Sequence, residues 1–361
     1  MGRCRTNPPS FIPASVLWRM FIAFIISGLW LGGAVLCSGP PLDCRDDDAT
    51  CSPTATLLAL TATGVLTPVD CSDDGELWES HAATEPNSWY AVTYGNGQFV
   101  AVSIDGTNRI MTSSDGMSWT PRSAPEANGW SAITFGNNTF VSVASSGTNR
   151  IMRSTDGITW TPHMAPEANL WYGVAYGNNI FAAVANSGTN RAMSSPLGAT
   201  WTPRAAAEPN QWAGITYGNE FVALSYGGTN RVMTSTDGIN WSPQAAAEAN
   251  TWRALTFGNN LYVAVAISGT NRVMTSSDAS AWTPHMATEA NSWTSVTYGA
   301  GLYVAVSSDG TNRIMTSTDG ANWTPRTQPE PNSWQSITYG DGKFVAVSID
   351  GANRVMVSTC D

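Results

Sequence analysis

The chain has 361 residues, a formal net charge of −10, and 12% charged against 42% hydrophobic side chains. Lysine occurs once, at Lys343, and 17 basic residues stand against 27 acidic ones, which excludes the basic surface that nucleic acids or anionic lipids require. The 33 glycines and 20 prolines indicate many tight turns between short strands.

Residues 1–38 have the composition of an export signal. Arg3, Arg5 and Arg19 are its only charged residues, and an uncharged run of eighteen residues extends from Met20 to Cys37. This run is longer than the usual core of a signal peptide and just long enough to cross a bilayer as a helix. A cleaved signal peptide and a single membrane anchor are both compatible with it. In either case the arginines stay inside, and we expect the rest of the chain outside the cytoplasm.

Residues 39–70 are rich in Pro, Thr and Asp and are predicted to form a stalk. None of the six cysteines lies between Cys71 and Cys360. In an oxidising compartment we expect two disulfides. One would join Cys44 to Cys51 across a short acidic loop, and the other would join Cys71 to Cys360 at the two ends of the remaining chain.

Residues 71–361 repeat one unit seven times, with a period of 41 residues that is once 40. Two series of tryptophans mark the units. The first series is Trp89, Trp130, Trp171, Trp212, Trp252, Trp293 and Trp334. The second series is Trp78, Trp119, Trp160, Trp201, Trp241, Trp282 and Trp323. A period near 40 with four short apolar runs per unit is typical of a β-propeller.

The first unit is predicted to contain strands at residues 89–94, 99–103, 109–113 and 119–122, separated by turns of Gly, Asn and Asp. The last unit stops after its third strand, and the segment around Trp78 matches the missing fourth strand. The sequence therefore predicts an all-β, seven-bladed β-propeller that is closed by pairing its N- and C-terminal strands. We expect it to be monomeric and to follow a hydrophobic export or anchor helix.

A turn in most units has the sequence S-[ST]-D-G-x-x-W, as at Ser113–Trp119 and Ser154–Trp160. It resembles the Asp-box of BNR-repeat propellers, a group that includes sialidases, sortilin-type receptors and photosystem II assembly factors. The turn is one residue shorter than the usual Asp-box. The resemblance implies the propeller fold and admits a sialidase-like activity. From the residues themselves, we expect Asp115 and its equivalents to accept backbone hydrogen bonds within their own turns.

Charged residues recur on one predicted face, which carries the loops between units and the loops between the second and third strands. The first set of loops contains the loop glutamates, which are Glu85, Glu126, Glu167, Glu208, Glu248, Glu289 and Glu330. The second set ends in the loop arginines, which are Arg109, Arg150, Arg191, Arg231, Arg272, Arg313 and Arg354. These groups are expected either to form Arg–Glu bridges between blades or to line seven equivalent ligand pockets.

Two smaller sets of residues break the pattern of the repeat. Asp105, Asp309 and Asp350 precede a loop glycine in three units that are consecutive once the ring is closed. They suggest either a cation or ligand subsite or chance divergence between copies. His81, His163 and His285 share one position at the end of the fourth strand, where we expect them to be exposed and too dispersed to bind a metal together.

A sialidase needs one asymmetric site, with three arginines, a tyrosine nucleophile with its glutamate, and an aspartic acid. Here the arginine, glutamate and Tyr/Phe positions recur in every unit, and no single copy stands out as an asymmetric cluster. The favoured function is therefore an exported, non-enzymatic propeller that presents a multivalent binding face to a glycan or an extracellular protein. A sialidase-like hydrolase and a purely structural scaffold are the alternatives. No catalytic residue, metal or cofactor is predicted.

Overall fold

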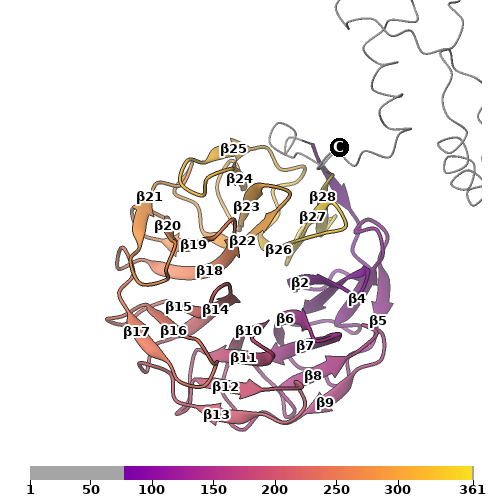
Figure 1. Cartoon of the computed structure of the whole chain (residues 1–361). Coiled ribbons are helices and arrows are strands. Elements are labelled where there is room, and N and C mark those ends of the chain that lie inside the picture. Colours follow the sequence, from indigo (N-terminus) through magenta and orange to yellow (C-terminus); the bar gives the residue numbers. More distant parts are fainter. Residues whose placement is uncertain (1–76, 360–361) are drawn as a thin grey trace, which may run out of the picture. The chain divides into compact units, whose positions relative to one another are not determined.

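The computed structural model describes residues 77–359, which form seven four-stranded antiparallel sheets arranged as the blades of a propeller around a central opening (Figure 1). The predicted export helix, the stalk and both predicted disulfides lie outside these residues. Within the same range, no helix is long and apolar enough to span a membrane.

The strands of each blade follow one another from the centre to the rim. Blade 1 contains β2 (Trp89–Gly95), β3 (Gln98–Ser103), β4 (Ile110–Ser113) and β5 (Thr120–Arg122). Blade 2 contains β6 (Trp130–Gly136), β7 (Thr139–Ala144), β8 (Ile151–Ser154) and β9 (Thr161–His163). Blade 3 contains β10 (Trp171–Gly177), β11 (Ile180–Ala185), β12 (Ala192–Ser195) and β13 (Thr202–Arg204). Blade 4 contains β14 (Trp212–Tyr217), β15 (Phe221–Ser225), β16 (Val232–Ser235) and β17 (Ser242–Gln244).

The remaining blades repeat this order. Blade 5 contains β18 (Thr251–Gly258), β19 (Leu261–Ser268), β20 (Val273–Ser276) and β21 (Thr283–His285). Blade 6 contains β22 (Trp293–Gly299), β23 (Leu302–Ser307), β24 (Ile314–Ser317) and β25 (Thr324–Arg326). Blade 7 contains β26 (Trp334–Gly340), β27 (Lys343–Ser348), β28 (Val355–Thr359) and, from the other end of the array, β1 (Trp78–His81). The strands predicted for the first unit match blade 1 to within one residue at each end.

The ring closes at the predicted seam. β1 pairs antiparallel with β28, from Trp78 opposite Ser358 to His81 opposite Val355. The indole of Trp78 is 8% exposed and lies 6.5 Å from the ring of Phe344 in β27, measured between centroids. The first and last described strands therefore share one sheet, which confirms the predicted closure and leaves no blade incomplete.

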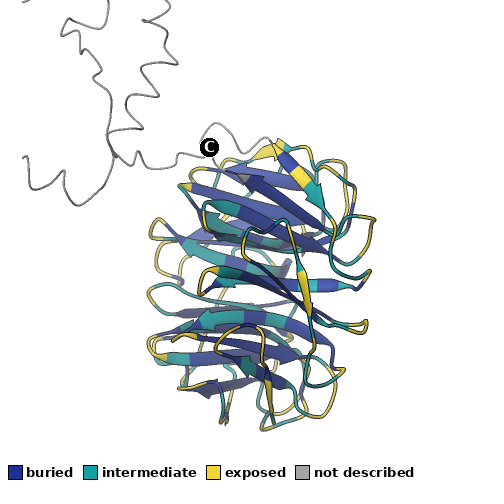
Figure 2. Cartoon of the chain, turned by 90° about the vertical axis from the view of Figure 1, so that its right-hand side faces the viewer, coloured by how far each residue is buried: buried dark blue, intermediate teal, exposed yellow. Residues whose placement is uncertain are grey.

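The core lies between the blades, so each blade is buried on both faces (Figure 2). All seven tryptophans of the first series have no exposed surface. Trp130, for example, packs with Phe140 of its own blade and with Val100 and Val102 of the preceding blade. Two-sided burial explains why the second strands are almost continuously apolar and do not alternate with polar residues.

Two positions of the unit, those of Gly95 and Gly106, have no room for any side chain. Gly106 has a φ of +88°, and a Cβ there would lie 1.8 Å from the side-chain oxygen of Asn87. Gly95 lies under the ring of Phe135 in the next blade, where a Cβ would lie 2.2 Å from Cγ. A side chain at either position would displace a neighbouring loop or a neighbouring blade, which explains why these glycines recur along the chain.

The outermost strand of a blade is short and has an unpaired edge. In β5, β9, β13, β17, β21 and β25 its middle residue is proline, as at Pro121. Proline lacks a backbone N–H, so in sheets it is confined largely to edge strands. In β1 the position of Pro121 is taken by Ser80, which lies opposite Met356 as Pro121 lies opposite Met111.

Candidate functional site

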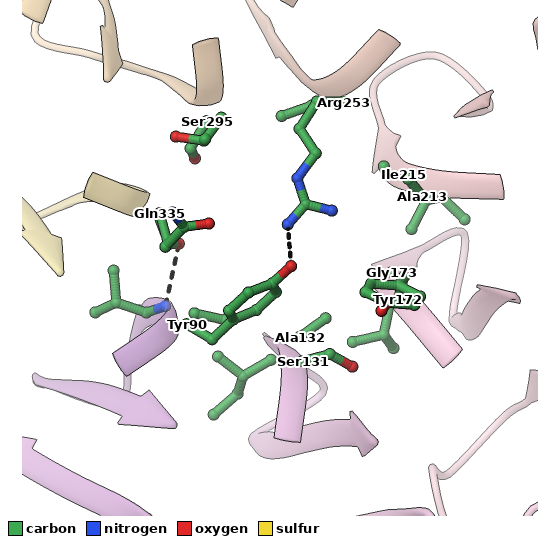
Figure 3. Close-up of a pocket in the computed structure, with 18 of the residues that line it drawn as sticks. Tyr90, Ser131, Ala132, Tyr172, Gly173, Ala213, Ile215, Arg253, Ser295 and Gln335 are labelled. Atoms are coloured by element: carbon green, nitrogen blue, oxygen red, sulfur yellow. Dashed lines mark hydrogen bonds between the residues drawn. The ribbon is translucent and has the colours of Figure 1, made fainter. Parts of the chain in front are cut away.

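The clearest pocket along the propeller axis lies in the central channel, near the face that carries the loops between blades. Its walls come from the innermost strands of the seven blades (Figure 3). Its volume is about 160 Å³. The pocket includes the first residues of these strands and stops before the turns at their far ends. We call this opening the channel mouth.

The residue after each first-series tryptophan faces the channel mouth. A register shift next to the tryptophan interrupts the ladder between the first and second strands in every blade. Such a bulge lets the tryptophan pack between blades while the next side chain is aimed elsewhere. The seven residues at this position are Tyr90, Ser131, Tyr172, Ala213, Arg253, Thr294 and Gln335. The side chain at this position is tyrosine in two blades and different in each of the other five.

Arg253 reaches across the channel mouth from β18 in blade 5 (Figure 3). Its Nη2 donates a hydrogen bond to the hydroxyl of Tyr90 in blade 1 at 2.7 Å, and its Nη1 donates to the hydroxyl of Tyr226 in the β15–β16 loop. The guanidinium carbon lies 5.3 Å from the ring centroid of Tyr90 and 5.8 Å from that of Tyr226. Both distances are within the range of cation–π attraction, so the two tyrosines hold the cation by ring and by hydroxyl.

Arg253 is the only residue of the pocket lining that is ionised at neutral pH. Among residues 77–359, no carboxylate lies within ion-pair distance of it. Burial raises the pKa of Tyr172 and of Tyr226, so both phenols keep their protons at neutral pH. The channel mouth therefore combines one arginine cation with neutral hydroxyls, in a protein whose net charge is negative.

The loop glutamates are held by asparagines of their own blades. In blade 1, the carboxylate of Glu85 accepts hydrogen bonds from Asn108 N at 3.1 Å, Asn108 Nδ2 at 2.5 Å and Asn87 Nδ2 at 3.3 Å. In the other six blades, the asparagine equivalent to Asn108 donates the same side-chain bond to the loop glutamate. Burial alone would raise the pKa of Glu85, but these hydrogen bonds bring it below its ordinary value. The carboxylates thus stabilise the loops that carry them.

The loop arginines donate to backbone carbonyls. Arg109 Nε donates to Gly106 O at 3.0 Å, and its Nη1 donates to Asn128 O of the next blade at 2.8 Å. The same bond spans the seam, from Arg354 Nη1 to Asn87 O at 2.7 Å. The arginines therefore link neighbouring blades through carbonyl oxygens, and no Arg–Glu bridge of the kind expected as one alternative is found among residues 77–359. The reason is that the glutamates accept hydrogen bonds from asparagines, and the arginines donate theirs to backbone carbonyl oxygens. A ligand-binding role for either set stays a prediction.

The structure does not bring the three extra aspartates together at one site. Each binds the serine that precedes the first-series tryptophan of its own blade. Asp105 Oδ1 accepts from Ser88 N at 2.6 Å and Oδ2 accepts from Ser88 Oγ at 2.7 Å, and Asp309 and Asp350 bind Ser292 and Ser333 in the same way. Aspartate occurs where this serine occurs, so a local hydrogen-bonded pair accounts for the pattern.

The three histidines are half-buried, which corrects the expectation that they are exposed. His285 Nε2 lies 2.9 Å from Thr275 Oγ1, and burial lowers the pKa of His163 and of His285. The side chain of the third, His81, is 23% exposed and lies beside Glu79. Residues 77–359 contain no cluster of three or more potential metal ligands.

The Asp-box-like turns have the structural role that was predicted. Asp115 Oδ1 accepts hydrogen bonds from Met117 N and Ser118 N, both at 2.8 Å, and Trp119 Nε1 donates to Gly116 O at 2.9 Å. Burial opposes ionisation of Asp115, but the backbone donors lower its pKa to about 2. The turn is therefore stabilised by a carboxylate that stays ionised over nearly the whole pH range.

The family model of the DUF6242 β-propeller domain matches residues 76–212 and 243–361. The chain belongs to this family. No curated protein matches the sequence. The finer resemblance to BNR-repeat and sialidase-type propellers is not confirmed by the family match.

Solved structures share the fold at low sequence identity. Virginiamycin B lyase from Staphylococcus aureus, as a catalytically inactive variant with quinupristin, has a TM-score of 0.69 and 16% identity, covering 78% of this chain and 98% of the lyase chain. YCF48 from Cyanidioschyzon merolae has a TM-score of 0.58 and 15% identity, covering 78% and 97%. YCF48 bound to a D1 peptide has a TM-score of 0.61 and 15% identity, covering 79% and 95%. These likenesses support the fold and assign no activity.

Sequence reasoning missed the channel mouth. The features that recur seven times favoured the loops, whereas Arg253, Tyr90 and Tyr172 occupy a position that varies among the copies. Other positions vary as much, such as that of Gln98, Thr139 and Ile180. Variability alone therefore does not single out the channel mouth, which depends on contacts across the ring.

Proposed function

We propose that this protein is an exported, non-enzymatic propeller that binds one ligand, a glycan or an extracellular protein, at its channel mouth. The observation that carries the proposal is the asymmetric cluster of Arg253, Tyr90, Tyr172 and Tyr226 in an otherwise repetitive ring. A concave pocket with a few convergent polar groups is the usual form of a binding site.

Occupied hydrogen-bonding groups argue against seven equivalent pockets. The loop glutamates accept from asparagines and the loop arginines donate to carbonyls, so a ligand on these groups would have to replace existing bonds. At the channel mouth, in contrast, the hydroxyl of Tyr172 makes no hydrogen bond within the described residues. A single central site therefore fits the available donors better than a multivalent rim.

The composition of the pocket favours binding over hydrolysis. Its lining contains tyrosines and one arginine but no histidine, aspartate or glutamate. Most glycoside hydrolases rely on a pair of carboxyl groups, and sialidases also need a carboxylic acid close to their tyrosine. The similar solved propellers include an enzyme, virginiamycin B lyase, and a peptide complex, YCF48 with D1 peptide. The shared fold therefore does not choose between the two, and the proposal rests on the residues of the lining.

Export is the second part of the proposal and rests on residues 1–38, whose arginines precede an uncharged run of eighteen residues. Protease added to intact cells that express the full chain should degrade the propeller if it is surface-anchored, and the medium should contain it if the signal is cleaved. A propeller that stays protected inside the cytoplasm would contradict export.

The binding proposal is tested with a glycan array and a panel of extracellular peptides, using the full-length chain. A channel-mouth variant, Tyr172→Ala with Gln335→Ala, should lose the ligand that the wild type retains. A matched rim variant, Met286→Gln, changes a side chain that is 76% exposed and should keep it. Calorimetry should give one ligand per chain. A stoichiometry near seven, or binding that survives in the channel-mouth variant, would contradict a single central site.

A further inference from the structure

The channel mouth also indicates the chemistry of its ligand, an inference that rests on the binding function proposed above. We propose that the site binds its ligand through a carboxylate group, which would meet Arg253 and the phenols beside it.

The charge of Arg253 is the first argument. Its two hydrogen-bond partners, Tyr90 and Tyr226, are neutral hydroxyls, and no acidic side chain among the described residues neutralises it. A partly buried cation without a counter-ion is unfavourable, because the protein replaces only part of its hydration. An anionic ligand would supply the missing charge. The planar guanidinium fork favours a carboxylate, which it can bind through two parallel hydrogen bonds.

The direction of the hydrogen bonds is the second argument. Tyr90 and Tyr226 accept from the guanidinium through their oxygens, so the proton of each hydroxyl remains free to be donated. Tyr172 lines the same pocket, and its hydroxyl has no partner within residues 77–359. Two phenols of the lining, Tyr90 and Tyr172, and one cation thus border a space whose lining contains no carboxylate, and Tyr226 holds the cation from outside that lining.

The walls beyond the mouth are the third argument. The next lining residues along the strands include Ala91, Val92, Ile133 and Leu255, whose side chains pack into the core between blades and are at most 9% exposed. The hydroxyls of Ser295 and Ser336 in the same wall accept backbone hydrogen bonds, from Ile337 N and Val92 N, both at 3.2 Å. None of these residues is charged, so Arg253 is the only group of the lining that can pair with an anion.

The size of the pocket limits how much of a ligand enters. A volume of about 160 Å³ is smaller than the roughly 300–1,000 Å³ of pockets that bury a drug-sized molecule. It suits one end group of a ligand. A small free acid and the carboxyl terminus of a polypeptide both present a carboxylate at one end, and the experiment separates these two sources.

The test compares acids with their neutral amides by calorimetry on the full-length chain. The probes are isovalerate against isovaleramide, and a pentapeptide ending in leucine with a free carboxylate against the same peptide amidated. We expect each acid to bind the wild type more tightly than its amide. Arg253→Gln should weaken binding of the acid by about ten- to hundredfold, the range expected for a charged hydrogen bond, and leave the amide unchanged.

Matched variants separate this role from a structural one. Arg122→Gln removes the same charge from β5 at the rim, where Arg122 Nε donates to Thr112 Oγ1, and it should bind the acids as the wild type does. Tyr90→Phe removes one hydroxyl and keeps the ring, so it should weaken acid binding even if Arg253→Gln fails to fold. Tight binding of the peptide alone would identify a polypeptide terminus as the source, and tight binding of isovalerate would identify a free acid.

The carboxylate proposal can fail without the binding function. Equal affinity for acid and amide, unchanged in Arg253→Gln but lost in the Tyr172→Ala and Gln335→Ala variant, would overturn the carboxylate and leave the central site in place. Binding of either probe that survives in the channel-mouth variant would overturn both.

Discussion

Replacing Trp78 by alanine tests whether the seam holds the ring closed. Trp160 in blade 2 provides a matched control, because both indoles are 8% exposed and lie 6.5 and 6.3 Å from a phenylalanine ring of the same blade. Truncating a buried tryptophan costs about 3–5 kcal/mol. The two variants should therefore lose similar local packing. Their unfolding should differ. β1 is joined to blade 7 only by pairing with β28, since the next strand in the chain, β2, belongs to blade 1, whereas β9 follows β8 of its own blade directly in the chain.

In Trp78→Ala we expect the opening of lowest free energy to be separation of β1 from β28, with the other blades still folded. Hydrogen exchange should show protection of the β28 amides falling by about 10²–10³-fold, since each 1.4 kcal/mol is tenfold. Limited proteolysis should cut the chain between β1 and β2. In Trp160→Ala the urea midpoint should fall without selective exposure of β8. If β28 keeps wild-type protection in Trp78→Ala, pairing with β1 is not what holds the seam.

Further predictions concern the turns. The pKa of Asp115 and of Asp156 lies at about 2, below the ordinary value of 3.8, so the stability they contribute is complete above about pH 4 and is lost as the pH falls towards 2. An acid titration of the melting temperature should show this loss, and it should be smaller in Asp115→Asn. Gly198→Ala should cost about 1–3 kcal/mol more than Gly301→Ala in urea unfolding. Both glycines have positive φ, +71° and +81°, but only at Gly198 would the Cβ meet a neighbour, Val141 Cγ2 at 2.6 Å. Equal losses would show that backbone strain alone decides.

The architecture was predictable because it depends on repeated, local features. Tryptophan spacing gave the unit, turn residues such as Gly106 and Gly116 marked its strands, and the truncated last copy located the seam. Each of these features acts between neighbouring residues or neighbouring blades, so the same residues recur in unit after unit of the sequence. The consequence is that strand positions agree with the structure to within one residue, although the central strands carry no simple alternation of polar and apolar residues.

The site was less predictable, because it depends on which single residues meet across the ring. Arg253 and Tyr90 are 163 positions apart, and no local pattern links them. The predicted Arg–Glu pairing failed for a related reason. Opposite charges in adjacent loops suggested a bridge, but Asn108 and its equivalents lie closer to the glutamates and provide two donors each.

The prolines of the outer strands restrict how the molecule meets its surroundings. Six blades end in a strand with proline at its centre, so their rims offer no continuous row of backbone donors to an approaching β-strand. Near-identical sheets are otherwise well suited to stacking edge to edge into fibres. Strand pairing along the perimeter is therefore hindered in these six blades, and the channel mouth opens at one end of the axis, away from these edges.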